Sequence, residues 1–99
     1  MKSIGFAPAA RDEFDEAAAW YESHAEGLGQ RFVDCVDAVL QRIGDLPGGF
    51  PMWEMDLRFR RAVVPRFPYV IFYRELAQKV EIVAIAHGAR EPGYWLGRK

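Results

Sequence analysis

The sequence predicts an α+β domain in which a helix hairpin packs on one face of a twisted antiparallel sheet. Apolar residues recur at helical spacing through the first half of the chain, to about residue 44. From Leu57 onward the spacing changes to the alternation that is typical of β-strands. A short strand candidate precedes the first helix, so the predicted order is β-α-α-β-β-β, in one domain over residues 1–99.

The chain begins with a strand candidate at residues 2–6 and then a helix. Pro8 stands where a helix can begin, because the first turn does not use the missing N–H. The acidic residues that follow it favour the positive end of the helix dipole. One helical face is apolar and consists of Ala10, Phe14, Ala17, Tyr21 and Ala25. Gly27-Leu28-Gly29 ends this pattern and predicts a tight turn into a second, antiparallel helix.

The second helix is predicted over residues 28–44. Its broad apolar stripe consists of Leu28, Phe32, Cys35, Val36, Val39, Leu40 and Ile43. Arg31, Asp34, Asp37 and Arg42 fall on the opposite side. The segment 47–51, with two prolines and two glycines, cannot continue a helix and predicts a loop.

Three further strands are predicted at residues 58–64, 69–74 and 80–86. In the first of them, alternation puts Arg58 and Arg60 on one side and Arg61 on the other. The last is nearly continuous in apolar residues, as expected for a strand that is covered on one face and lies close to the centre of the sheet. The predicted core consists of Phe14, Tyr21, Phe32, Val36, Val39, Leu40, Ile43, Ile71, Phe72, Ile82 and Ala84.

Composition excludes several classes of protein. The chain is 51% hydrophobic and 27% charged, which is typical of a folded globular protein and not of a disordered one. No apolar stretch reaches the ~18 residues of a membrane span, and the N-terminus lacks the apolar core of a signal peptide. The single cysteine excludes an internal disulfide and a multi-cysteine zinc site. We therefore expect a cytoplasmic protein that contacts no membrane and needs no metal or cofactor.

The net charge of −1 conceals an uneven distribution. Residues 1–57 carry 4 basic and 11 acidic side chains, whereas residues 58–99 carry 9 basic and 3 acidic ones. This split suggests one acidic and one basic surface. A basic surface attracts phosphates or acidic protein segments, although surface charge also serves solubility alone.

Arginines and aromatic residues gather on or beside the predicted strands. Guanidinium groups bind phosphate and carboxylate oxygens in pairs and keep their charge at any working pH. The alternative is an edge strand whose charges prevent aggregation. The predicted target-binding residues are Arg58, Arg60, Arg61, Arg66, Arg90, Tyr94 and Trp95.

His87 closes the last predicted strand, where a histidine can transfer protons near neutral pH or serve only as a structural hydrogen-bonding group. No nucleotide fingerprint, P-loop or nucleophile elbow is present. No residue is therefore assigned as catalytic, and the candidates are Arg61, His87, Arg90 and Tyr94.

An ordered set of short motifs resembles the RelE/ParE superfamily of type II toxin–antitoxin toxins. The motifs span nearly the whole chain: Trp20-Tyr21-Glu22, Gly27-Leu28-Gly29 with Phe32, Arg60-Arg61, Phe67-Pro68-Tyr69-Val70-Ile71-Phe72-Tyr73, and Ala86-His87-Gly88-Ala89-Arg90 with Tyr94-Trp95. The resemblance implies the same α+β fold as the residue patterns. It also implies a cognate antitoxin that wraps and neutralises the protein.

The superfamily contains two activities: RelE-like members cut messenger RNA on the ribosome, and ParE-like members inhibit DNA gyrase. The RelE-like pattern has basic residues where this chain has Val63 and Val70. The resemblance therefore favours a ParE-like protein that acts by binding gyrase and not by turnover. A ribosome-dependent endoribonuclease is the alternative, with Arg61 and Arg90 on the scissile phosphate and His87 or Tyr94 moving protons. A non-toxic binding module on the same fold is a third possibility.

Overall fold

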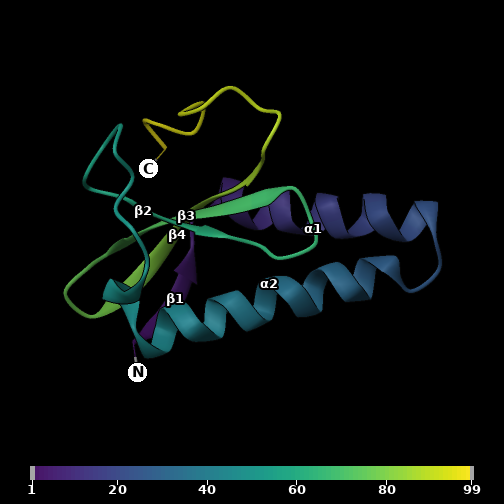
Figure 1. Ribbon diagram of the computed structural model, residues 1–99, viewed down its shortest axis with the longest axis horizontal. Coiled ribbons are helices and arrows are strands. Elements are labelled where there is room, and N and C mark those ends of the chain that lie inside the picture. Colours follow the sequence, from purple (N-terminus) through teal and green to yellow (C-terminus); the bar gives the residue numbers. More distant parts are fainter. Residues whose placement is uncertain (1, 99) are drawn as a thin grey trace.

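Two helices lie on one face of a four-stranded sheet in the computed structural model, which describes residues 2–98 (Figure 1). This arrangement confirms the predicted fold class. In chain order the elements are β1 (Ser3–Phe6), α1 (Pro8–His24), α2 (Leu28–Asp45), the short 3-10 helix η1 (Pro47–Gly49), β2 (Arg60–Val63), β3 (Tyr69–Glu75) and β4 (Lys79–His87).

The strand order across the sheet is β1-β4-β3-β2. β3 is antiparallel to β2 and β4, as expected for strands joined by short turns. β1, however, runs parallel to β4, from Ser3 beside Lys79 to Phe6 beside Ile82. The sheet is therefore mixed and not wholly antiparallel. A parallel pair requires a long crossover connection, and the helix hairpin is part of the chain that connects β1 to β4.

The turn between α1 and α2 depends on two glycines and one carboxylate. Gly27 has φ +84°, a left-handed conformation in which a side chain would be strained. A Cβ at Gly29 would lie 2.6 Å from the backbone oxygen of Ala18, so the two helices can approach here only without a side chain. Glu22 accepts hydrogen bonds from the N–H groups of Gly27 and Gly29, both at 2.9 Å. It thereby caps the start of α2.

The main core lies between the helix pair and the sheet. Most of the predicted core residues are buried there, including Phe14, Phe32 and Leu40. Tyr21 is only half-buried and packs against this core from its border. Phe72 and Ala84 are buried as predicted, but on the opposite face of the sheet.

That opposite face carries a second apolar layer, which the sequence did not predict. Trp53 and Phe59 from the 50–59 loop and Trp95 from the C-terminal segment (residues 88–98) cover Phe72 and Ala84. In Figure 1 the C-terminal segment, in yellow, runs on the side of the sheet away from α2. β4 is apolar on both sides because both of its faces are covered.

Trp95 is therefore a core residue. Its side chain is 1% exposed and packs against the rings of Trp53, Phe59 and Phe72. A side chain buried in this way cannot contact a target, so the prediction that Trp95 is a target-binding residue is wrong.

β2 is shorter than expected, since residues 58–64 were predicted and the strand begins at Arg60. Arg58 instead belongs to a turn in which Asp56 accepts hydrogen bonds from its backbone N–H and its guanidinium. The predicted alternation along the strand is confirmed. Ala62 faces the helices, while Phe59 belongs to the apolar layer on the far side of the sheet.

Candidate functional site

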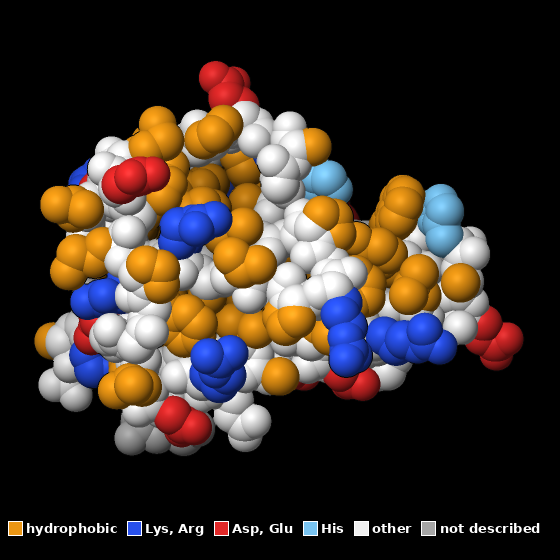
Figure 2. Space-filling view, in the orientation of Figure 1, with side chains coloured by type: hydrophobic (Ala, Val, Ile, Leu, Met, Phe, Trp, Pro, Cys, Tyr) orange, Lys and Arg blue, Asp and Glu red, His pale blue; other side chains and the backbone are white. Residues whose placement is uncertain are grey.

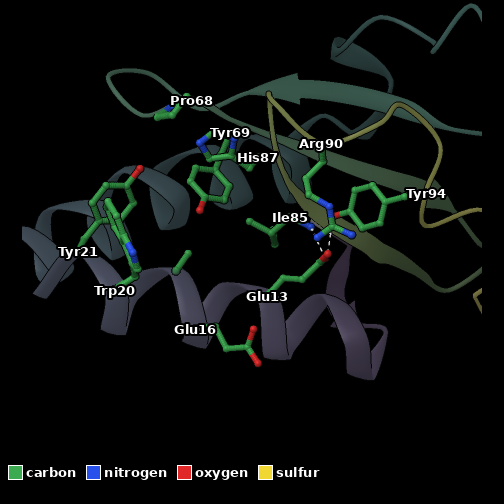
Figure 3. A pocket seen from close by; sticks show the side chains of 11 residues that line it. Glu13, Glu16, Trp20, Tyr21, Pro68, Tyr69, Ile85, His87, Arg90 and Tyr94 are labelled. Atoms are coloured by element: carbon green, nitrogen blue, oxygen red, sulfur yellow. Dashed lines mark hydrogen bonds between the residues drawn. The ribbon is translucent and has the colours of Figure 1, made fainter. Parts of the chain in front are cut away.

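Two hollows meet at the end of β4, on either side of the C-terminal segment. The larger is a cleft of about 550 Å³ between α1 and the end of β4 (Figure 3). The smaller is a depression of about 230 Å³ whose floor includes Val70, Phe72 and Ala86. His87, Arg90 and Tyr94 line both hollows, so these side chains form the ridge between them.

The cleft exists because β1 is short. β1 pairs with β4 only as far as Ile82, and beyond that point the edge of β4 faces α1. Two side chains take the place of the missing strand. Glu13 accepts a hydrogen bond from the Ile85 N–H at 3.1 Å, and Arg98 donates one to the Val83 carbonyl at 3.1 Å. These bonds satisfy backbone groups that β1 leaves unpaired.

Glu13 is the most heavily bonded side chain of the site. Its carboxylate also accepts hydrogen bonds from the Tyr94 hydroxyl and from both terminal nitrogens of Arg98, at 2.9 and 3.1 Å. Burial opposes its ionisation, but the hydrogen bonds from Arg98, Tyr94 and the Ile85 N–H outweigh it. Together they hold the pKa of Glu13 below its usual value.

Tyr94 and Arg90 form a stacked pair on the ridge. The guanidinium carbon of Arg90 lies 3.7 Å from the centre of the Tyr94 ring, a cation–π contact. The hydroxyl of Tyr94 is committed to Glu13. Burial and this bond to a carboxylate raise the pKa of Tyr94, so the phenol stays protonated at neutral pH.

His87 is fixed by its neighbours. Its Nδ1 accepts a hydrogen bond from the Ala89 N–H at 3.0 Å, and its ring packs edge-on against Tyr69. Because Nδ1 is the acceptor, a neutral ring carries its proton on Nε2, which is then a donor.

The depression brings the four candidate catalytic residues together. Arg61 reaches it from β2, while His87, Arg90 and Tyr94 line it from the opposite side. Within residues 2–98, neither Arg61 nor Arg90 forms an ion pair with a carboxylate. The depression presents two guanidinium groups and an imidazole around an apolar floor, and the acidic residue Glu91 also lines it. The two guanidinium groups are suited to binding an anionic group.

The other predicted target-binding arginines lie elsewhere. Arg58 pairs with Asp56 at 2.6 Å. Arg60 donates to the Phe50 carbonyl at 2.7 Å and lies 3.4 Å from Glu75. Arg66, with φ 71°, lines a separate groove beside α2. The structure thus brings Arg61 and Arg90 together and separates the other three from them.

Sequence reasoning missed Glu13 and Arg98, which hold the site together. The signal for Glu13 was present, since it lies three residues after Ala10 and four before Ala17, at the border of the buried stripe of α1. A carboxylate at such a position requires hydrogen-bond donors. Arg98 gave no comparable signal, because the tail that carries it has no periodicity.

No helix among residues 2–98 is both long and apolar enough to cross a membrane. In the same residues, no group of three or more His, Cys, Asp or Glu side chains could hold a metal ion.

Comparison with known proteins places this geometry in a family. Residues 4–92 match the family described as the ParE toxin of the type II toxin–antitoxin system parDE. The chain belongs to the ParE toxin family. Toxin ParE2 of two Mycobacterium tuberculosis strains is 30% identical over 83 residues, which cover 82% of this chain and 76% of the relative. The expected resemblance, on the ParE side of the superfamily, is confirmed.

A solved structure of a chromosomal ParDE toxin–antitoxin system from P. aeruginosa has the same fold. It matches with a TM-score of 0.64 over 88% of this chain and 96% of the other. At 15% sequence identity, this likeness concerns the fold alone. It supports the mixed sheet and helix pair as the ParE architecture.

Proposed function

We propose that this ParE-family toxin arrests growth in the cytoplasm by binding DNA gyrase, and that a cognate antitoxin neutralises it. The observation that carries the proposal is the composition of the face around the depression. Its two arginines, Arg61 and Arg90, stand beside aliphatic side chains, a set that can hold an anionic group of a target but has fewer cations than the RelE-like pattern.

The aliphatic side chains beside the arginines belong to two residues that pair across neighbouring strands. Val63 of β2 pairs with Val70 of β3, and Val63 is 60% exposed, two residues from Arg61 on the same face. RelE-like nucleases carry basic side chains at these two positions. Removing one preorganised donor from a cleaving site typically costs about 2.7–4 kcal/mol of barrier, and here two positions are apolar.

Proton transfer has little support in this geometry. The Tyr94 hydroxyl donates to Glu13, and its raised pKa keeps it a poor acid at neutral pH. His87 has one nitrogen committed to the Ala89 N–H. These contacts favour binding over turnover, with Arg61 and Arg90 meeting carboxylates or phosphates of the gyrase complex.

The antitoxin has a surface available to it. Met52, Met55, Leu57 and Leu96 are between 46% and 68% exposed, on or beside the apolar layer that covers the far face of the sheet. Hydrophobic side chains are spread over the visible face in Figure 2, with isolated basic groups between them. An amphipathic segment of a partner can cover such a surface. The family description, a toxin of a toxin–antitoxin system, supports this partner.

Induction of the protein alone in cells, with DNA supercoiling and messenger cleavage followed in the same culture, tests the proposal. We expect growth arrest with loss of negative supercoiling and intact messenger RNA. Cleaved messenger with normal supercoiling would instead support the ribosome-dependent endoribonuclease. Normal growth at high expression would support a non-toxic binding module.

A further inference from the structure

One carboxylate joins parts of the chain that lie far apart in sequence. Glu13, on α1, bonds to Ile85 on β4 and to Tyr94 and Arg98 in the C-terminal segment. Its side chain is only 16% exposed. Residues 88–98 contain no helix or strand, so side-chain contacts decide where this segment lies.

The contacts continue from Glu13 to the target-binding face. The Tyr94 hydroxyl donates a hydrogen bond to Glu13. The Arg90 guanidinium lies over the Tyr94 ring, with its carbon 3.7 Å from the ring centre. Figure 3 shows Glu13 on the helix, with Tyr94 and Arg90 together beside it. Arg90 itself makes no ion pair with a carboxylate among residues 2–98. The Tyr94 ring is therefore the contact that fixes the direction of its side chain.

We propose that Glu13 is a positioning residue, which orients Arg90 through Tyr94 for contact with the target. This inference rests on the proposed function, because it gives Arg90 a target to meet. It assigns to α1 a role beyond packing, since α1 holds the C-terminal segment in the conformation that binds.

The arrangement requires a carboxylate of this length. All of the groups that face Glu13 are donors, namely the Ile85 N–H, the Tyr94 hydroxyl and two guanidinium N–H groups. A glutamine would turn its own NH₂ toward one of these donors and leave that donor unpaired. An aspartate is one methylene shorter, so its carboxylate, starting from the same position on α1, cannot reach all four of these donors.

The first arm of the test needs no target. Because Arg90 stacks on the Tyr94 ring, we expect the ring current to place the Arg90 side-chain proton resonances upfield in the wild type. We expect Glu13→Gln to return them toward their random-coil positions. Tyr94→Phe, which keeps the ring and removes only the bond to Glu13, should do the same. Glu16→Gln is the matched control, because Glu16 lies one turn further along α1 and is exposed. Glu16 lines the cleft but not the depression, and Glu13, not Glu16, accepts the hydrogen bond from Tyr94.

The second arm measures inhibition of DNA supercoiling by purified gyrase. Loss of a charge-assisted contact predicts that Glu13→Gln weakens inhibition at least about tenfold. If Glu13 acts through Arg90, the double variant with Arg90→Ala is no weaker than Arg90→Ala alone. A melting curve for each variant shows that it is folded.

The outcomes separate the two proposals. The positioning role would be overturned if the Arg90 resonances stay in place in folded Glu13→Gln. It would also be overturned if the losses of gyrase inhibition from the two substitutions add independently in the double variant. A wild-type protein that leaves gyrase unaffected overturns the proposed target, and the resonances then decide the placement of Arg90 without it. Resonances that shift in Glu13→Gln and Tyr94→Phe but not in Glu16→Gln support the placement in either case.

Discussion

At the residue scale, Arg90 combines a position on the ridge with a guanidinium that has no carboxylate partner within residues 2–98. Such a group contributes little to folding, since even an exposed ion pair is worth only about 0–1 kcal/mol. We predict that Arg90→Ala abolishes growth arrest while the melting temperature changes little. Arg58→Ala is the control, because Asp56 already pairs with Arg58. Growth arrest at the wild-type level in Arg90→Ala would remove this residue from the site.

Glu13 gives the protein a predicted pH dependence. Its pKa is lowered in the folded state, from an ordinary value of 4.5. The stability that it contributes is therefore fully present above the unfolded value and is lost as pH falls through the folded one. Melting temperatures measured from about pH 3 to pH 6 should fall on acidification, and the fall should be shallower in Glu13→Gln. Identical slopes of melting temperature against pH in the two proteins would mean that the pKa of Glu13 is the same in the folded and the unfolded state.

At the element scale, the helix hairpin depends on the close approach at Gly29. A Cβ there would lie 2.6 Å from the Ala18 oxygen and 2.9 Å from the Glu22 side chain, so Gly29→Ala must displace backbone. Overpacking of this kind costs about 1–3 kcal/mol of unfolding free energy. Gly48→Ala is the matched control, since its Cβ would have its nearest neighbour at 4.0 Å. Chemical denaturation of both variants measures the difference, and equal midpoints would contradict the tight crossing.

The buried face of α2 gives a second prediction at this scale. Leu40 is 9% exposed in the main core, whereas Leu46, just after the helix, is 65% exposed. We expect Leu40→Ala to lower the free energy of unfolding by about 2–5 kcal/mol. Leu46→Ala should change it by no more than about 0.5 kcal/mol. An unchanged melting temperature for Leu40→Ala would show that α2 presents another face to the sheet.

Sequence patterns predict these elements well where one period dominates. The stripes of α1 and α2 and the alternation of β2 are local, so their residues indicate which face is buried. The parallel pairing of β1 and the second apolar layer are not local, because they depend on contacts between residues far apart in the chain. Trp95 is an example. The sequence alone does not distinguish whether an aromatic residue in a tail without periodicity binds a target or covers the sheet.

The same limit applies to the site. Arg61 and Arg90 could be selected from their motifs, and the structure brings them to one depression. Alternation along the strand also predicted that Arg58 and Arg60 lie on the other side from Arg61. Their ion pairs with Asp56 and Glu75, and the place of Arg66 in a groove beside α2, follow from no spacing rule. Glu13 and Arg98 lie 85 residues apart in sequence, and only the folded chain shows that they meet.

At the scale of the whole molecule, the acidic half of the sequence forms both helices and the basic half forms β2, β3 and β4. With the exposed apolar side chains of the 50–59 loop, this division suits a partner segment that is amphipathic. We predict that co-expression with an adjoining short reading frame yields a stable complex that buries more than about 1,200 Å². A pull-down from such cells checks this. Recovery of the toxin with no small companion protein would count heavily against an antitoxin of this kind.

The measurement that tests the central claim most directly is a supercoiling assay with purified gyrase, run beside a translating system that reports messenger cleavage. We predict that the purified toxin inhibits supercoiling and leaves ribosome-bound messenger intact. We also predict that Arg90→Ala weakens the inhibition at least about tenfold. Messenger cut on the ribosome, with supercoiling unaffected at the same toxin concentration, would contradict the proposed function.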